Sequence, residues 1–102
     1  MWAIYQLGLK YRNGSDGFDK NLPEGLKYIR MAAERGYAKS QCQLGYVYGK
    51  GEGVPQDMKK GFDFSMQAAV QGYAAAQFNI GLKYLNGSGV DKDVNQSFIW
   101  FK

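Results

Sequence analysis

Histidine is absent from the 102-residue sequence, and cysteine occurs only once. The absence of histidine removes the commonest general base, the Ser–His and Cys–His nucleophile pairs, and the imidazole ligands of metal ions. The single Cys42 excludes an intramolecular disulfide and a cysteine zinc site, and we interpret it as a small apolar packing residue. We therefore expect no catalytic residues, no metal site and no cofactor.

Long apolar runs are also missing. No stretch approaches the roughly 20 apolar residues that a membrane span needs, and Met1 to Tyr5 lack the basic start and apolar core of a signal peptide. The 13 Lys and Arg residues exceed the 9 Asp and Glu residues, but they are scattered, so we expect no nucleic-acid partner. The sequence predicts a soluble chain, cytoplasmic or periplasmic, without deciding between the two.

What the sequence does contain is an internal repeat. Gly81 follows Gly45 by 36 residues, and Gly72 follows Gly36 by the same distance. A period in the middle thirties is typical of helical solenoids. We predict an all-α solenoid of antiparallel helix pairs with about two and a half to three repeats, over residues 1–37, 38–73 and an incomplete 74–102.

Each unit carries signals for two helices. Asn21, Asp57 and Asp93 are predicted N-caps of the second helices, and a capping box is expected from Asn21 with Glu24 and from Asp93 with Gln96. Gly36 and Gly72 are expected to end second helices in a left-handed conformation. Residues 15–20 read as a turn-rich loop, one residue longer than its equivalents.

Gly45 is predicted to stand in the middle of a helix, where glycine lowers helix propensity by about 1 kcal/mol relative to alanine. We therefore expect a second helix to cross it closely, with Ala68 and Ala69 as the opposing surface. Gly53 is expected to adopt a positive φ, and Val54 to lie under the helix pair.

The unit reads Leu-Gly-x-x-Tyr, then Gly-x-Gly-Val, Asp, an aromatic residue and Ala-Ala-x-x-Gly-Tyr. This pattern resembles the Sel-one-like repeat family, a relative of the tetratricopeptide repeats. The matching positions of the middle copy are Leu44, Gly45, Tyr48, Gly51, Gly53, Val54, Asp57, Phe64, Ala68, Ala69 and Gly72. The resemblance implies a right-handed superhelix that acts as an adaptor or scaffold, commonly in bacterial signalling, envelope or host-interaction systems.

The motif residues are structural in the family, so the resemblance implies no catalytic or ligand residue. Some secreted members carry a disulfide in every repeat, and a chain with one cysteine is not of that subtype. Departures from the pattern are expected to loosen the packing without endangering the fold: Gly25, Gly61 and Ser97 replace alanine, Tyr28 and Phe64 replace tryptophan, and Phe18 replaces valine.

If the fold is correct, the first helices line a concave face, and positions on them that packing does not use are free to bind. The partner-binding residues predicted there are Tyr5, Leu9, Arg12, Lys39, Tyr46, Lys50, Phe78, Leu82 and Lys83. Aromatic side chains that act as anchors, with basic side chains at the margins of the stripe, suit an apolar peptide or helix that carries acidic groups. The alternative is that several of these side chains pack between neighbouring helices.

Two other functions remain open. In the second hypothesis, the chain is a self-assembling fragment of a longer scaffold. It would associate through its uncapped ends and through Phe98, Trp100 and Phe101. An enzyme would need a carboxylate pair from Asp57, Asp63, Asp91 or Asp93, of which two are predicted caps. We favour a non-enzymatic protein-interaction module.

Overall fold

The computed structural model describes residues 2–14 and 21–101, and in these residues it contains helices and no strand. The helices are α1 (Trp2–Asn13), α2 (Leu22–Glu34), α3 (Ala38–Lys50), α4 (Met58–Val70), α5 (Ala74–Asn86) and α6 (Val94–Phe101). The all-α repeat fold predicted from the sequence is confirmed. Met1, Lys102 and the loop 15–20 with Phe18 lie outside the described residues, so the predictions for that loop stay untested.

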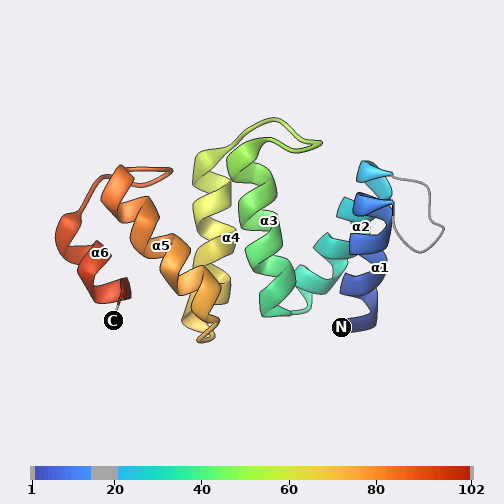
Figure 1. The fold of residues 1–102 in the computed structure, drawn as a ribbon, viewed down its shortest axis with the longest axis horizontal. Helices are drawn as coiled ribbons and strands as arrows, with labels where there is room; N and C mark the ends of the chain where they lie inside the picture. The colour runs from blue at the N-terminus through green and yellow to red at the C-terminus, as the bar shows by residue number, and fades with distance from the viewer. Residues whose placement is uncertain (1, 15–20, 102) are drawn as a thin grey trace.

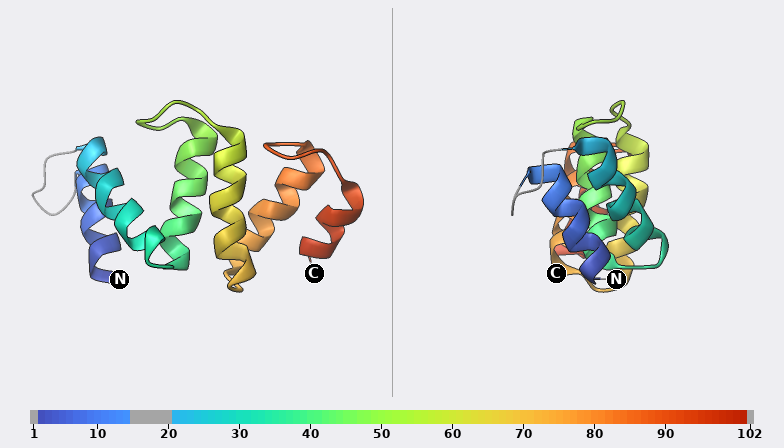
Figure 2. Two further views of the ribbon diagram at one scale, coloured as in Figure 1. Left: turned by 180° about the vertical axis from the view of Figure 1, so that it is seen from behind. Right: turned by 90° about the vertical axis from the view of Figure 1, so that its right-hand side faces the viewer.

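The six helices of the described residues follow one another in a row along a molecule of 46 × 25 × 19 Å, with α1 and α6 at opposite ends of the long axis (Figure 1). The α3–α4 and α5–α6 connections lie at one edge of the row, and the α2–α3 and α4–α5 connections lie at the other (Figure 2). Neighbouring helices therefore run in opposite directions, as the helix pairs of a solenoid do.

The predicted N-caps are formed, but the capping boxes are only half formed. The side chains of Asn21, Asp57 and Asp93 accept hydrogen bonds of 3.0–3.2 Å from backbone N–H groups three residues on. The N–H groups of the same three residues donate to the carbonyls of Tyr11, Tyr48 and Tyr84 in the preceding helices. The reciprocal half of the predicted box is absent at Asn21 and Asp93, because the donor it would use is already bonded.

Gly36 and Gly72 end α2 and α4 as predicted. Both have a φ of 91°. After α2, the N–H of Tyr37 donates to the Ala32 carbonyl at 3.1 Å and that of Gly36 to the Ala33 carbonyl at 3.0 Å. This arrangement is a Schellman motif, which satisfies the last carbonyls of the helix.

The close crossing predicted at Gly45 is present, but its opposing surface is not Ala68 and Ala69. A β-carbon on Gly45 would lie 2.9 Å from the Gly61 carbonyl and would clash with Ser65 Oγ. A β-carbon on Gly61 would in turn lie 2.8 Å from the Gly45 carbonyl. The expectation that Gly61 loosens the packing was therefore wrong, since its missing side chain lets the two backbones meet.

Two apolar clusters form the core. The first contains Leu26, Ile29, Ala33, Leu44, Val47 and Tyr48, with Val54 packed against it as predicted. The second contains Ala68, Ala69, Ala76 and Ile80. Glutamine amides tie the repeats together beside these clusters: Gln41 Nε2 donates to the Ala33 carbonyl and Gln77 Nε2 to the Ala69 carbonyl, each at 3.2 Å.

Candidate functional site

A pocket of about 300 Å³ opens between α3 and α5. Its lining residues come from α3, the start and middle of α4, α5 and the two loops beside them: Gly45, Tyr46, Gly49, Lys50, Gln56, Met58, Ser65, Asn79, Leu82, Lys83 and Ser88. Because α3 and α5 are the first helices of successive pairs, the pocket lies on the face that the sequence singled out for binding.

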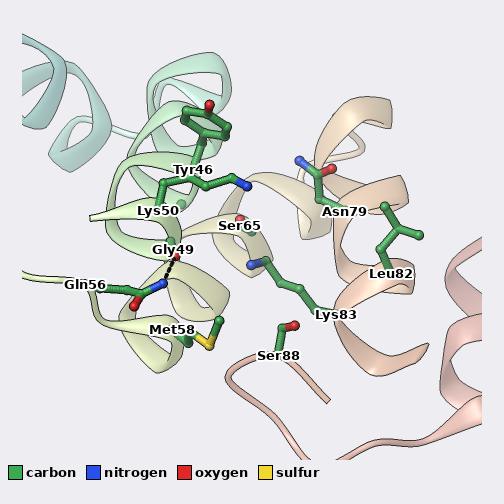
Figure 3. A pocket seen from close by; sticks show the side chains of 11 residues that line it. Tyr46, Gly49, Lys50, Gln56, Met58, Ser65, Asn79, Leu82, Lys83 and Ser88 are labelled. Carbon is green, nitrogen blue, oxygen red and sulfur yellow. Dashed lines mark hydrogen bonds between the residues drawn. The ribbon is translucent and has the colours of Figure 1, made fainter. Parts of the chain in front are cut away.

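Four of the nine predicted binding residues meet in this pocket. Tyr46 and Lys50 extend from α3, while Leu82 and Lys83 extend from α5 on the opposite side (Figure 3). The Tyr46 side chain is 48% exposed and that of Leu82 is 37% exposed. The pocket thus combines accessible apolar surface with two ammonium groups.

Lys83 reaches across from α5 towards α3. Its Nζ lies 3.8 Å from the point where a β-carbon on Gly49 would stand, so the glycine leaves room for the ammonium group. Desolvation by burial lowers the pKa of Lys83, and the nearby charge of Lys50 lowers it further. Both effects disfavour the charged form of Lys83 in the free protein.

Arg12 lies beside this pocket rather than in it. Its guanidinium forms an ion pair with Glu52 and lies 5.9 Å from the centre of the Tyr46 ring. The Arg12 side chain is thereby held against the aromatic residue that lines the pocket. It connects the first repeat to the face formed by the second and third repeats.

The other predicted residues lie elsewhere. Tyr5 and Leu9 pack against the first core cluster, and the Tyr5 ring meets the Tyr37 ring edge-on at 5.4 Å. Lys39 is exposed at the start of α3, and the half-exposed Phe78 ring contacts the Phe101 ring at 5.5 Å. Tyr5 and Leu9 therefore pack between helices, as in the alternative considered for the stripe, whereas Lys39 takes no part in such packing.

Five polar or flexible side chains of the pocket were missed by the sequence analysis: Gln56, Met58, Ser65, Asn79 and Ser88. Gln56 Nε2 donates to the Gly49 carbonyl at 2.9 Å, which holds the α3–α4 loop at the pocket edge. A stripe drawn on the first helices alone cannot include the loop residues Gln56 and Ser88 or residues of α4, whereas Asn79 lies on α5 but outside the chosen stripe. Aligning the repeats position by position would have marked Ser88, because it stands at the position that Glu52 has one repeat earlier.

Cys42 is a half-buried packing residue against the second core cluster. Burial raises the pKa of its thiol, although a 3.8 Å hydrogen bond from Asn79 Nδ2 to Sγ favours the thiolate. The thiol therefore stays protonated at neutral pH, in line with its interpretation as a small apolar residue.

The four carboxylates considered for catalysis do not converge. Asp57 and Asp93 cap helices, Asp63 lies 3.8 Å from Lys59 on the exposed face of α4, and Asp91 is exposed in a loop. Within residues 2–14 and 21–101, no group of three or more Cys, Asp or Glu residues could hold a metal ion. Over the same residues, every helix is too short or too polar to cross a membrane.

Comparison with known proteins gives a match to the Sel1 repeat over residues 3–37, 38–73 and 74–102. The chain belongs to the Sel1 repeat family. Sel1 repeats are in general protein-interaction modules, built as repeat scaffolds without an enzymatic centre. No protein among those with curated descriptions matches the sequence.

Solved structures of Sel1 repeat proteins from bacteria are similar to this chain. A Sel1 repeat protein from Oxalobacter formigenes is 38% identical with a TM-score of 0.90, over 98% of this chain and 74% of its own. The protective antigen c5321 of uropathogenic Escherichia coli, which has an SLR fold, is also 38% identical with a TM-score of 0.94, but this chain spans only 21% of it. Cysteine-rich protein B of Helicobacter pylori, at 21% identity, a TM-score of 0.82 and 79% coverage of its chain, shares the fold.

Proposed function

We propose that this Sel1 repeat chain is an adaptor that binds a peptide or helical segment of a partner protein on the face formed by α1, α3 and α5. The observation that carries the proposal is the pocket where Tyr46 and Leu82 lie beside Lys50 and Lys83. Partly exposed aromatic and aliphatic side chains in a concave site are typical anchors of protein interfaces. Cations at the edge orient an acidic-apolar partner.

Peptide selection tests this proposal and does not require the partner to be identified. Peptides from a random displayed library are selected on the intact chain, and their affinities are measured for Tyr46→Ala and Leu82→Ala. We expect each substitution to weaken binding at least tenfold while the melting temperature changes little, because both side chains are partly exposed. Val70→Ala is the matched control, since Val70 is 69% exposed on α4 and does not line the pocket.

Two outcomes would contradict the proposal. One is that the selected peptides bind Tyr46→Ala and Leu82→Ala as tightly as the parent chain. The other is that Val70→Ala loses binding to the same extent, which would place the interface on the outer helices.

Self-association is a second candidate, favoured by the apolar surface of α6. The exposed fractions of Phe98, Ile99 and Phe101 are 60%, 59% and 41%, while Trp100 packs against the second core cluster. Burying a large apolar side chain stabilises by roughly 1.5–3 kcal/mol. Covering this face with a second copy would therefore favour a dimer, which sedimentation at increasing concentration would detect.

A further inference from the structure

The two interfaces between successive repeats contain equivalent hollows. The hollow of the first interface is lined by Arg12, Asn13, Leu22 and Glu52. The equivalent residue of the next repeat lies 37 positions later for residues before the loop 15–20, and 36 positions later for residues after it. The four lining residues therefore align, in the same order, with Gly49, Lys50, Met58 and Ser88. All four of the latter line the pocket between α3 and α5, so the same place in the fold occurs twice.

The two hollows differ in charge. In the first, the Arg12 guanidinium is paired with the Glu52 carboxylate. In the second, Gly49 stands at the position of Arg12, and Ser88 stands at the position of Glu52. No acidic residue is among the described residues that line the second hollow. The carboxylate that completes the first hollow therefore has no counterpart in the second.

The second hollow nevertheless has two cations, which come from other positions. Lys50 aligns with Asn13, and Lys83 aligns with Val47, whose side chain is completely buried. Within the described part of the chain, neither lysine forms an ion pair. Lysine stands at this position in the first and third repeats, as Lys10 and Lys83, whereas the second repeat buries Val47 there. Lys83 is half-buried where it lines the pocket beside Lys50.

We propose that this pocket binds the carboxylate of an acidic side chain from a partner protein, held between Lys50 and Lys83 in the place that Glu52 occupies in the first hollow. This inference rests on the proposed function and names the chemistry of its partner. The source is a protein segment because Tyr46, Met58 and Leu82 are exposed around the lysines. These side chains would contact apolar residues that flank the acidic one.

A substitution within the chain tests, without a ligand, whether the pocket with Lys50 and Lys83 favours a carboxylate. Ser88→Glu places a carboxylate where Glu52 stands in the first hollow, and a glutamate is compatible with that turn because Glu52 adopts it. We expect Ser88→Glu to raise the melting temperature and the pKa of Lys83, measured by NMR titration, relative to Ser88→Gln. Equal stability and an equal Lys83 pKa in the two variants would overturn the proposal.

Titration with small probes tests recognition directly. N-acetylglutamate N-methylamide is added to the isotopically labelled chain, and the amide signals of Gly49, Lys83 and Ser88 are followed. We expect saturable shifts that are at least tenfold weaker with the neutral N-acetylglutamine N-methylamide, and that disappear in Lys83→Met and Ser88→Glu. Lys83→Met should fold, because Val47 provides an apolar side chain at the equivalent position.

Further probes separate the sources of the anion. A peptide with leucines on both sides of glutamate should bind at least tenfold more tightly than the amino-acid probe if the ligand is a protein segment; equal affinity would favour a small carboxylic acid and contradict the protein source. Tighter binding of inorganic phosphate would contradict carboxylate recognition. If a selected peptide loses affinity for Tyr46→Ala but binds Lys83→Met as tightly as the parent chain, this inference is overturned and the proposed function stands.

Discussion

Gly45 and Gly49 lie one turn apart on α3 and serve different purposes. A β-carbon on Gly45 would meet the backbone of α4 at Gly61 and Ser65. At Gly49 the nearest atom to such a β-carbon is Lys83 Nζ at 3.8 Å, which is ordinary van der Waals contact. The first glycine permits the helix crossing, and the second keeps the pocket open.

Replacing Gly45 with leucine should therefore destabilise the fold by about 3 kcal/mol, because overpacking at a backbone contact outweighs any gain in helix propensity. Chemical denaturation measures the change. Gly49→Ala is the matched control and should be neutral or stabilising by up to about 1 kcal/mol. A Gly45→Leu variant as stable as the parent would show that the crossing is misplaced.

Lys83→Val should stabilise the chain by about 0.5–2 kcal/mol at neutral pH while abolishing recognition of acidic ligands. The cause is desolvation of the ammonium group, which lowers the pKa of Lys83 from its usual 10.5. The gain should be largest below the folded-state pKa, where Lys83 is charged, and should shrink as the pH rises through that pKa, because the folded chain then releases its proton. Denaturation of both proteins at neutral and alkaline pH measures this difference, and an unchanged gain would contradict the assigned cause.

At the scale of the helix, the second helix of each repeat begins with one side-chain cap and a backbone hydrogen bond from the cap residue to the preceding helix. At α4, Asp57 accepts from the Lys60 N–H at 3.0 Å and its own N–H donates to the Tyr48 carbonyl at 2.8 Å. The hydrogen bond from the Asp57 N–H to the Tyr48 carbonyl holds the start of α4 beside the end of α3. The helix pair is thus connected through its backbone as well as its apolar core.

Asp57→Ala should cost about 1 kcal/mol, because it removes the cap and leaves the backbone bond to Tyr48 in place. Thermal unfolding should show this as a fall in melting temperature of roughly 4–8 °C for a chain of this size. Asp63→Ala is the control: its ion pair with Lys59 is solvent-exposed, and such pairs contribute between 0 and about 1 kcal/mol. An Asp57→Ala variant no less stable than Asp63→Ala would show that the cap is dispensable.

The sequence predicted the elements well, because their signals are local and occur in each repeat. The caps at Asp57 and Asp93, the left-handed Gly36 and Gly53, and the crossing at Gly45 all follow from residue type and position. Prediction from the sequence failed where the structure depends on which residues of two different helices come into contact. The sequence predicts Ala68 and Ala69 opposite Gly45, but α3 crosses α4 nearer its start, at Gly61 and Ser65. The repeat pattern contains no signal for the position of this crossing.

The candidate site was predicted only in part for the same reason. A helical stripe grouped Tyr46, Lys50, Leu82 and Lys83, which line one pocket, but it also included Tyr5 and Leu9, which pack against the first core cluster. Whether a first-helix residue is covered depends on the next repeat. The pocket itself depends on three helices and two loops meeting, which no single stripe represents.

Across the molecule as a whole, α6 is the helix that presents three large apolar side chains close together to solvent: Phe98, Ile99 and Phe101. Replacing Phe98 and Ile99 with serine should abolish self-association while preserving the fold, because both side chains are mostly exposed. Sedimentation over a range of concentrations measures the effect. We expect the parent chain to associate at high concentration and the double variant to remain monomeric. A parent chain that stays monomeric throughout would contradict this second candidate function.

NMR mapping of a selected peptide on the labelled chain locates the interface residue by residue, and so tests binding at the pocket between α3 and α5 most directly. We expect the largest changes on Tyr46, Gly49, Leu82 and Lys83, around the pocket between α3 and α5. Changes confined to α2 and α4, with the signals of the pocket unmoved, would contradict binding at this pocket.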